Sequence, residues 1–145
     1  MGSVIDQSVG DVMTRSVRTI PSGTTASEVA TLFAEHDIGS AVVVDPETGE
    51  YSGIVTESDI MQQVAAGADV DSVRVAAFLS APLVTVASTE DIHAAATVMK
   101  EHSIRRLPVT DDGDVVGILT TTDLTHYLPR LRNAILRGRN DLVAP

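Results

Sequence analysis

A short stretch that occurs twice constrains the fold of this chain more than any other feature. Residues 53–59 read Gly-Ile-Val-Thr-Glu-Ser-Asp, and residues 117–123 read Gly-Ile-Leu-Thr-Thr-Thr-Asp. In each copy an apolar run typical of a strand leads into a polar segment typical of a helix start. The pattern predicts strands at 51–55 and 115–119, followed by helices at 58–64 and 122–128.

Both copies place an aspartate three residues after a threonine, as Thr56 and Asp59 and as Thr120 and Asp123. This spacing is typical of a capping box, and it puts both residues on one helix face. The same turn has free backbone N–H groups and the positive end of the helix dipole, which suit phosphate. An aspartate one turn into a helix can also accept hydrogen bonds from a ribose diol. The stretch is therefore either a plain helix cap or half of a nucleotide site.

The residues before the first copy predict the rest of a β-α-β-β-α unit. Residues 17–20 form a β-prone run that Pro21 should stop, and residues 9–13 read as a short helical lead-in. Thr25 and Glu28 have capping-box spacing and predict a helix that ends near Asp37. Residues 41–44 are continuously apolar, which predicts a buried strand, and 45–49 have turn composition.

The second half repeats this order, so we expect a mixed α/β (α+β) fold with two equivalent repeats. The repeats are predicted at 9–64 and 75–128, with a linker at 65–74 and a tail at 129–145. Identical residues recur at matching places, as in Val9/Val75, Thr19/Thr85, Ser22/Ser88, Glu35/Glu101, His36/His102, Ile38/Ile104, Val43/Val109 and Asp45/Asp111.

Composition and charge exclude several classes of protein. The 145 residues are 43% hydrophobic, which suffices for a core, and they include no cysteine for a disulfide or a thiolate metal site. No run approaches the ~18 apolar residues of a membrane span, and no signal-peptide pattern occurs, so we expect a cytoplasmic protein without membrane insertion. The net charge of -10 opposes nucleic acid and anionic lipid. With Lys100 as its only lysine, the acidic chain resembles proteins of salt-accumulating archaea, although an ordinary acidic cytosolic protein is the alternative.

Further motifs make the resemblance to one family specific. The segments Val-Met-Thr at 12–14, Val-Arg-Thr-Ile-Pro at 17–21 and Ile-Arg-Arg-Leu-Pro-Val at 104–109 accompany the duplicated stretch. Together they resemble the CBS domain, named after cystathionine β-synthase, which in tandem forms a Bateman module. The resemblance implies two three-stranded sheets about a pseudo-twofold axis, with clefts at their interface. It further implies an adenosyl compound (AMP, ADP, ATP or S-adenosylmethionine) as regulatory ligand, no prosthetic group, a homodimer and an unknown regulated protein.

The resemblance also assigns roles to particular residues. In the second cleft Asp123 would hold the ribose, and Thr120 and Thr122 would lie near phosphate, which Arg105 and Arg106 could neutralise. In the first cleft Gly39 and Ser40 stand in place of the two arginines, which weakens an independent phosphate site there. The resemblance also leaves open that the arginines of the second repeat serve either cleft. The adenine pocket of the second cleft would be lined by Thr85, Val86, Ile104 and Leu107. The corresponding first-cleft set is Asp59, Thr56, Ser58, Thr19, Ile20, Ile38 and Ala41.

The remaining candidates point away from catalysis. The sequence holds no Gly-x-Ser-x-Gly, His-Glu-x-x-His or Walker motif, so we expect no enzyme and no metal site. His36 and His102 are predicted at helix ends, where a histidine interacts well with the dipole, and the alternative that the resemblance implies is a contact with phosphate. The alternative function is a constitutive dimerisation scaffold whose clefts stay empty or hold an ion. In either case the second helix of each repeat would meet a partner copy through Ile60, Met61, Val64, Leu124 and Leu128.

Overall fold

The computed structural model of the chain describes residues 7–126. The chain divides into two compact units, which are described separately. The first unit comprises Val17–Val84, and the second comprises Met1–Ser16 together with Thr85–Pro145.

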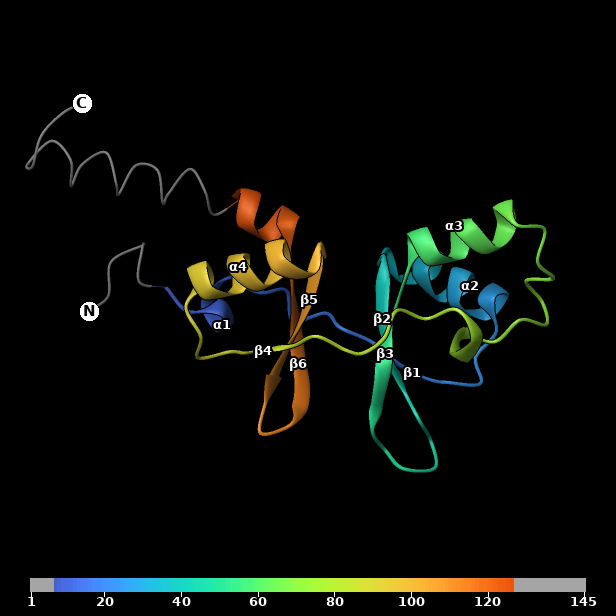
Figure 1. The fold of residues 1–145 in the computed structure, drawn as a ribbon, viewed down its shortest axis with the longest axis horizontal. Helices are drawn as coiled ribbons and strands as arrows, with labels where there is room; N and C mark the ends of the chain where they lie inside the picture. Colours follow the sequence, from blue (N-terminus) through green and yellow to red (C-terminus); the bar gives the residue numbers. More distant parts are fainter. Residues whose placement is uncertain (1–6, 127–145) are drawn as a thin grey trace, which may run out of the picture. The chain divides into compact units, whose positions relative to one another are not determined.

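The first unit is a three-stranded sheet with helices on one face (Figure 1). Its elements are β1 (Thr19–Pro21), α2 (Ala26–His36), β2 (Ser40–Val44), β3 (Tyr51–Thr56) and α3 (Glu57–Ala65), followed by the 3₁₀ helix η2 (Val75–Ala77). The central strand β2 pairs in parallel with β1 and antiparallel with β3. The parallel pair needs a crossover connection, which α2 supplies.

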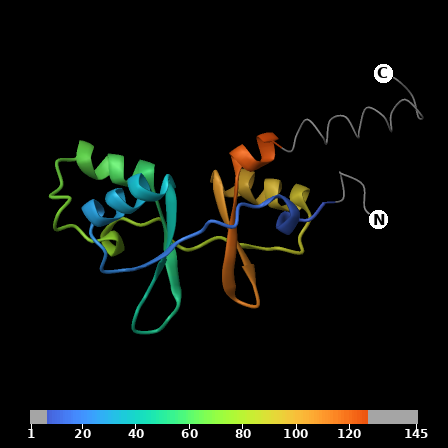
Figure 2. The same cartoon turned by 180° about the vertical axis from the view of Figure 1, so that it is seen from behind.

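The second unit has the same topology (Figure 2). Its elements are α1 (Val9–Val12), β4 (Val86–Ala87), α4 (Ile92–His102), β5 (Arg106–Asp111) and β6 (Asp114–Thr120). Residues 121–126 are helical and occupy the position that α3 has in the first unit. The mixed α+β class and the repeated β-α-β-β-α order predicted from the sequence are therefore confirmed. The predicted helix residue Leu128 and the tail at 129–145 lie outside the described residues.

Each unit has an aliphatic core beneath its helices. In the first unit Val29 and Phe33 of α2 pack against Ala41 and Val43 of β2 and Val55 of β3. Leu107 and Val109 of β5 and Leu119 of β6 are fully buried in the second unit. No polar side chain is buried within residues 7–126. Polar side chains are thus left at the ends and surfaces of the units, where a site can form.

Several element boundaries differ from the predictions by one or two residues. The strand predicted to end at residue 55 includes Thr56, and α3 begins at Glu57 instead of Ser58, because Thr56 itself is the N-cap. The run predicted at 17–20 is wrong at both ends, since β1 spans Thr19–Pro21 and so begins two residues later and includes the proline. Proline is tolerated there because β1 is an edge strand.

The segments that precede β1 and β4 are exchanged between the units. The first lead-in (residues 7–16) belongs to the second unit, where Thr14 and Ile118 exchange backbone hydrogen bonds of 2.9 and 2.8 Å. The second lead-in (residues 73–84) belongs to the first unit, where Ser80 and Ile54 exchange bonds of 2.8 and 3.0 Å. Sequence analysis did not predict this exchange.

The glycine of each duplicated stretch makes room for a lead-in. A Cβ on Gly53 would overlap the carbonyl oxygen of Ser80 and lie 2.7 Å from Leu79 Cδ1. A Cβ on Gly117 would lie 2.6 Å from Met13 Sδ and 2.9 Å from the carbonyl oxygen of Thr14. Only a residue without a side chain allows this approach, so these glycines are required by packing.

Candidate functional site

The strand-to-helix junction of the first unit is a complete capping box. The Thr56 N–H donates to Asp59 Oδ2 over 2.9 Å, and Thr56 Oγ1 donates to the same oxygen over 3.1 Å. In return, the Asp59 N–H donates to Thr56 Oγ1 over 3.3 Å. All of these contacts to the carboxylate use Oδ2. Within residues 7–126 the other oxygen, Oδ1, accepts no hydrogen bond, so half of the carboxylate stays available.

The second junction has the same reciprocal pair of backbone N–H contacts, and its aspartate has a further contact with a distant segment. The Thr120 N–H donates to Asp123 Oδ2 over 2.9 Å, and the Asp123 N–H donates to Thr120 Oγ1 over 3.0 Å. Asp123 Oδ1 accepts a 2.9 Å hydrogen bond from Thr14 Oγ1, which comes from the first lead-in. Sequence analysis missed Thr14 as a site residue. Its presence in the Val-Met-Thr motif, with no assigned role, was the available signal.

Arginines lie beside the second junction but not beside the first. The Thr121 N–H donates to the Arg105 carbonyl over 3.0 Å, and Arg106 pairs with Thr120 across β5 and β6. In the first unit the Glu57 N–H donates to the Gly39 carbonyl over 3.1 Å, and Ser40 pairs with Thr56. The structure thus brings together the residues predicted to bind phosphate in the second cleft. It also confirms that Gly39 and Ser40 take their places in the first unit.

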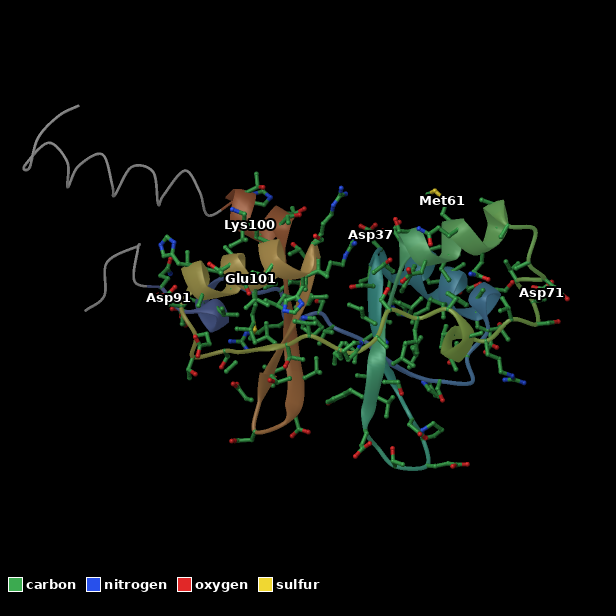
Figure 3. The ribbon with its side chains drawn as sticks, in the orientation of Figure 1. Asp37, Met61, Asp71, Asp91, Lys100 and Glu101 are labelled. Carbon is green, nitrogen blue, oxygen red and sulfur yellow. The ribbon has the colours of Figure 1, made fainter. Side chains whose placement is uncertain are left out.

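The first unit has a different cation near this end of its sheet. Arg18 Nη2 donates to His36 Nδ1 over 3.0 Å, and the Arg18 carbonyl accepts from the Val42 N–H over 2.9 Å. Both His36 and His102 end their helices, as the sequence predicted. Asp37, the residue after α2, lies at the same end and opposes an incoming phosphate (Figure 3). Sequence analysis did not assign Arg18 a role, although it directly precedes the predicted site residue Thr19.

The residues predicted to line an adenine pocket differ in accessibility. Leu107 and Ala41 are buried within their own units, as are Ile20 and Val86, so their side chains are committed to the cores. Ile38 and Ile104 are half-buried and follow the helices α2 and α4 at equivalent places. Among all the predicted site residues, the polar ones that are exposed are Thr19, Ser58, Thr85, Arg105 and Thr122.

The outer side of α3 carries apolar side chains. Met61 is 68% exposed and Val64 is 61% exposed, whereas Ile60 packs against the core. Met61 points away from the sheet (Figure 3). In the described part of the chain, no cluster of three or more His, Asp or Glu side chains could hold a metal ion. Nor is any helix there long and apolar enough to cross a membrane.

Comparison with known proteins identifies the family. The model of the CBS domain matches residues 9–66 and again residues 75–130. This chain belongs to the CBS-domain family. The resemblance predicted from the duplicated stretch is therefore confirmed, and the chain contains two CBS domains in tandem.

Its relatives include proteins solved with adenosyl ligands. An uncharacterised protein of Methanopyrus kandleri is 39% identical over 126 residues, which are 86% of this chain and 64% of that protein. A CBS domain protein of Pyrobaculum aerophilum, complexed with AMP, is 30% identical with a TM-score of 0.76, and the match covers 87% of this chain and 98% of that one. The CBS domain pair of the protein MJ0100, in complex with 5′-methylthioadenosine and S-adenosylmethionine, is 26% identical with a TM-score of 0.75. This match covers 85% of this chain and 96% of that one.

Proposed function

We propose that this CBS pair binds an adenosyl compound and that binding regulates a partner protein in trans. The observation that carries the proposal is the fixed carboxylate at each strand-to-helix junction. Asp59 and Asp123 each use Oδ2 for the helix cap and present Oδ1 on the other side. The solved relatives that hold AMP or S-adenosylmethionine support adenosine as the shared part of the ligand.

The cap and the ribose site are compatible functions of one side chain. A carboxylate has about four positions at which it can accept hydrogen bonds. The capping box of Asp59 occupies positions on Oδ2 only. A vicinal diol can therefore donate to Oδ1 while the helix start stays intact. The box even favours binding, because it holds the carboxylate in one orientation before the ligand arrives.

The arginines determine where a phosphate would bind. Arg105 and Arg106 lie at the start of β5, beside the start of the helix that follows Thr120, where backbone N–H groups and the helix dipole already favour an anion. Guanidinium groups match the geometry of phosphate oxygens. The junction in the second unit is thus the better candidate for the phosphate of AMP, ADP or ATP. The junction of the first unit, where Asp37 offsets the charge of Arg18, is the weaker candidate for a phosphate and suits a less negatively charged ligand such as S-adenosylmethionine.

The proposed role is regulatory and cytoplasmic, with no prosthetic group and no chemical reaction. A specific observation favours self-association as part of it. Met61 and Val64 are large apolar side chains left largely exposed on one helix. A second copy of the chain that covers them would remove this apolar surface from water. A constitutive dimerisation scaffold would use the same surface, and its two aspartates would then serve as helix caps alone.

Calorimetric titration with AMP, ATP and S-adenosylmethionine tests the proposal. Asp123→Ala should weaken binding at the second site at least tenfold, because hydrogen bonds to a charged acceptor are lost. Asp59→Ala should act only on the other site. Glu28→Ala is the matched control, since Glu28 closes the same kind of capping box with Thr25 on α2. It should cost similar stability and leave the affinity unchanged.

A thermal-shift panel separates the sensor from the scaffold. A ligand present at about 100 times its Kd adds roughly 2.7 kcal/mol to the free energy of unfolding. A scaffold with no adenosyl site would show no response. If Asp59→Ala, Asp123→Ala and Glu28→Ala all lose stability but bind ligand equally, the aspartates are helix caps alone.

A further inference from the structure

The two carboxylates differ in the hydrogen bonding of Oδ1. Asp123 Oδ1 accepts from Thr14 Oγ1 over 2.9 Å. The residue at the equivalent place in the first unit is Ser80, which pairs with Ile54 through the backbone as Thr14 pairs with Ile118. Yet within residues 7–126 the Ser80 hydroxyl makes no hydrogen bond to Asp59. Asp123 Oδ1 is therefore partly occupied by the protein itself, whereas Asp59 Oδ1 is open.

We propose that Thr14 determines the specificity of the second site by competing with ribose for Asp123. This inference rests on the proposed function, because it concerns the same carboxylate. Thr14 Oγ1 fills one of the acceptor positions on Oδ1, and a further position on Oδ2 is taken by the Thr120 N–H. A ribose diol must share Oδ1 with the threonine or displace it. At Asp59 the diol meets an oxygen with both positions free.

Thr14 cannot withdraw easily from Asp123. Its backbone is fixed by hydrogen bonds to Ile118 in both directions, and its carbonyl oxygen lies against Gly117. The hydroxyl can leave only by rotation about χ1, which a β-branched side chain resists. Thr14 is exposed, so water can replace the carboxylate as its partner once it rotates. The competition should therefore weaken ribose binding several-fold without abolishing it.

The experiment compares Thr14 variants with ligands that differ only in the ribose hydroxyls. An Asp59→Asn background, whose folding is checked by its thermal transition, limits the ribose readout to Asp123. Calorimetric titration then measures the affinity for adenosine and for 2′,3′-dideoxyadenosine of three proteins: this parent with Thr14 unchanged, its Thr14→Val variant and its Thr14→Ser variant. Valine keeps the β-branched shape and removes the hydroxyl, whereas serine keeps the hydroxyl. Ser80→Ala is the matched control at the equivalent place in the first unit.

Thr14→Val should bind adenosine about threefold or more tightly than the parent, because the competing donor is gone. Its affinity for dideoxyadenosine should stay the same, and Thr14→Ser and Ser80→Ala should resemble the parent. Equal or weaker adenosine binding by Thr14→Val would overturn the competition. An equal gain for both ligands would also overturn it, since that effect would not act through ribose. If no variant binds adenosine and the unmutated chain binds no adenosyl ligand, the proposed function itself fails.

Discussion

Replacing Gly53 by alanine should show how strongly the fold depends on the exchanged lead-ins. The new Cβ would overlap the Ser80 carbonyl oxygen and approach Leu79 Cδ1 to 2.7 Å. The Ser80 backbone is held by two hydrogen bonds to Ile54, so it cannot move without breaking them. Overpacking of this kind costs typically ~1–3 kcal/mol. We expect Gly53→Ala to lose at least about 2 kcal/mol of unfolding free energy.

The corresponding change at Gly117 should cost less. There the nearest atom is Met13 Sδ at 2.6 Å, the far end of a flexible side chain, and the Thr14 carbonyl oxygen is 2.9 Å away. Methionine adapts its conformation readily, so part of the overlap can be relieved. Gly117→Ala should therefore lose about 1 kcal/mol, in the lower part of the range for overpacking. The order of the two losses follows from which atom is in the way.

Urea denaturation followed by circular dichroism measures both losses. Gly23→Ala is the control, because Gly23 is outside the left-handed region and the one atom within 4 Å of its added Cβ is Arg74 Nη1, the end of a flexible side chain, at 3.4 Å. It should stay within ~0.5 kcal/mol of the parent, as surface changes usually do. Amide exchange at Ile54 and Ser80 should accelerate in Gly53→Ala. Unchanged stability of Gly53→Ala would refute the close approach, since Gly→Ala without a clash is itself mildly stabilising.

Other predictions concern the cap, the exposed helix and the phosphate site. Thr25→Ala should lose ~1 kcal/mol in the same denaturation experiment, because the N-cap of α2 loses its acceptor. Met61→Glu should lower the sedimentation coefficient at tens of micromolar protein if α3 meets a second copy, whereas Met61→Leu should not. Arg105→Ala and Arg106→Ala should each weaken the binding of ATP more than the binding of adenosine, as measured by calorimetric titration. For the unmutated chain, AMP affinity should hold or improve from ~0.1 to ~1 M salt, because salt first screens the repulsion from the net charge of -10.

The sequence was sufficient to predict the topology because the signals for it are local. The apolar run at 41–44 became β2, the capping box of Thr25 and Glu28 opened α2, and the duplicated stretch formed the same junction in both units. The second repeat supported each assignment, since the same sequence pattern predicted the same element at the equivalent place in both repeats. The one-residue error at Thr56 arose because a threonine can end a strand and cap a helix simultaneously.

The exchanged lead-ins could not be predicted from local pattern. Periodicity shows that residues 9–13 form a helix, but it does not show which sheet that helix packs on. The contact between Thr14 and Asp123 joins residues separated by 109 positions, and no spacing rule relates them. The glycines carried the only signal, because a glycine inside a strand often marks the close approach of another backbone. Considered with the Val-Met-Thr motif, Gly117 could have suggested that a distant segment crosses β6.

Gly117, the first lead-in and Thr14 together explain why the fold and the candidate site depend on each other in the second unit. Gly117 admits the first lead-in, the lead-in places Thr14, and Thr14 donates to the carboxylate that also caps the helix at 121–126. Because the chain enters the first unit at Val17, Thr14 lies only a few residues before that crossing. A ligand that displaced the Thr14 hydroxyl would therefore act directly on the connection between the units. Under the proposed function, ligand bound at Asp123 has this physical route to the rest of the chain. Ser80, whose hydroxyl makes no hydrogen bond to Asp59 within residues 7–126, provides no equivalent route from the first junction.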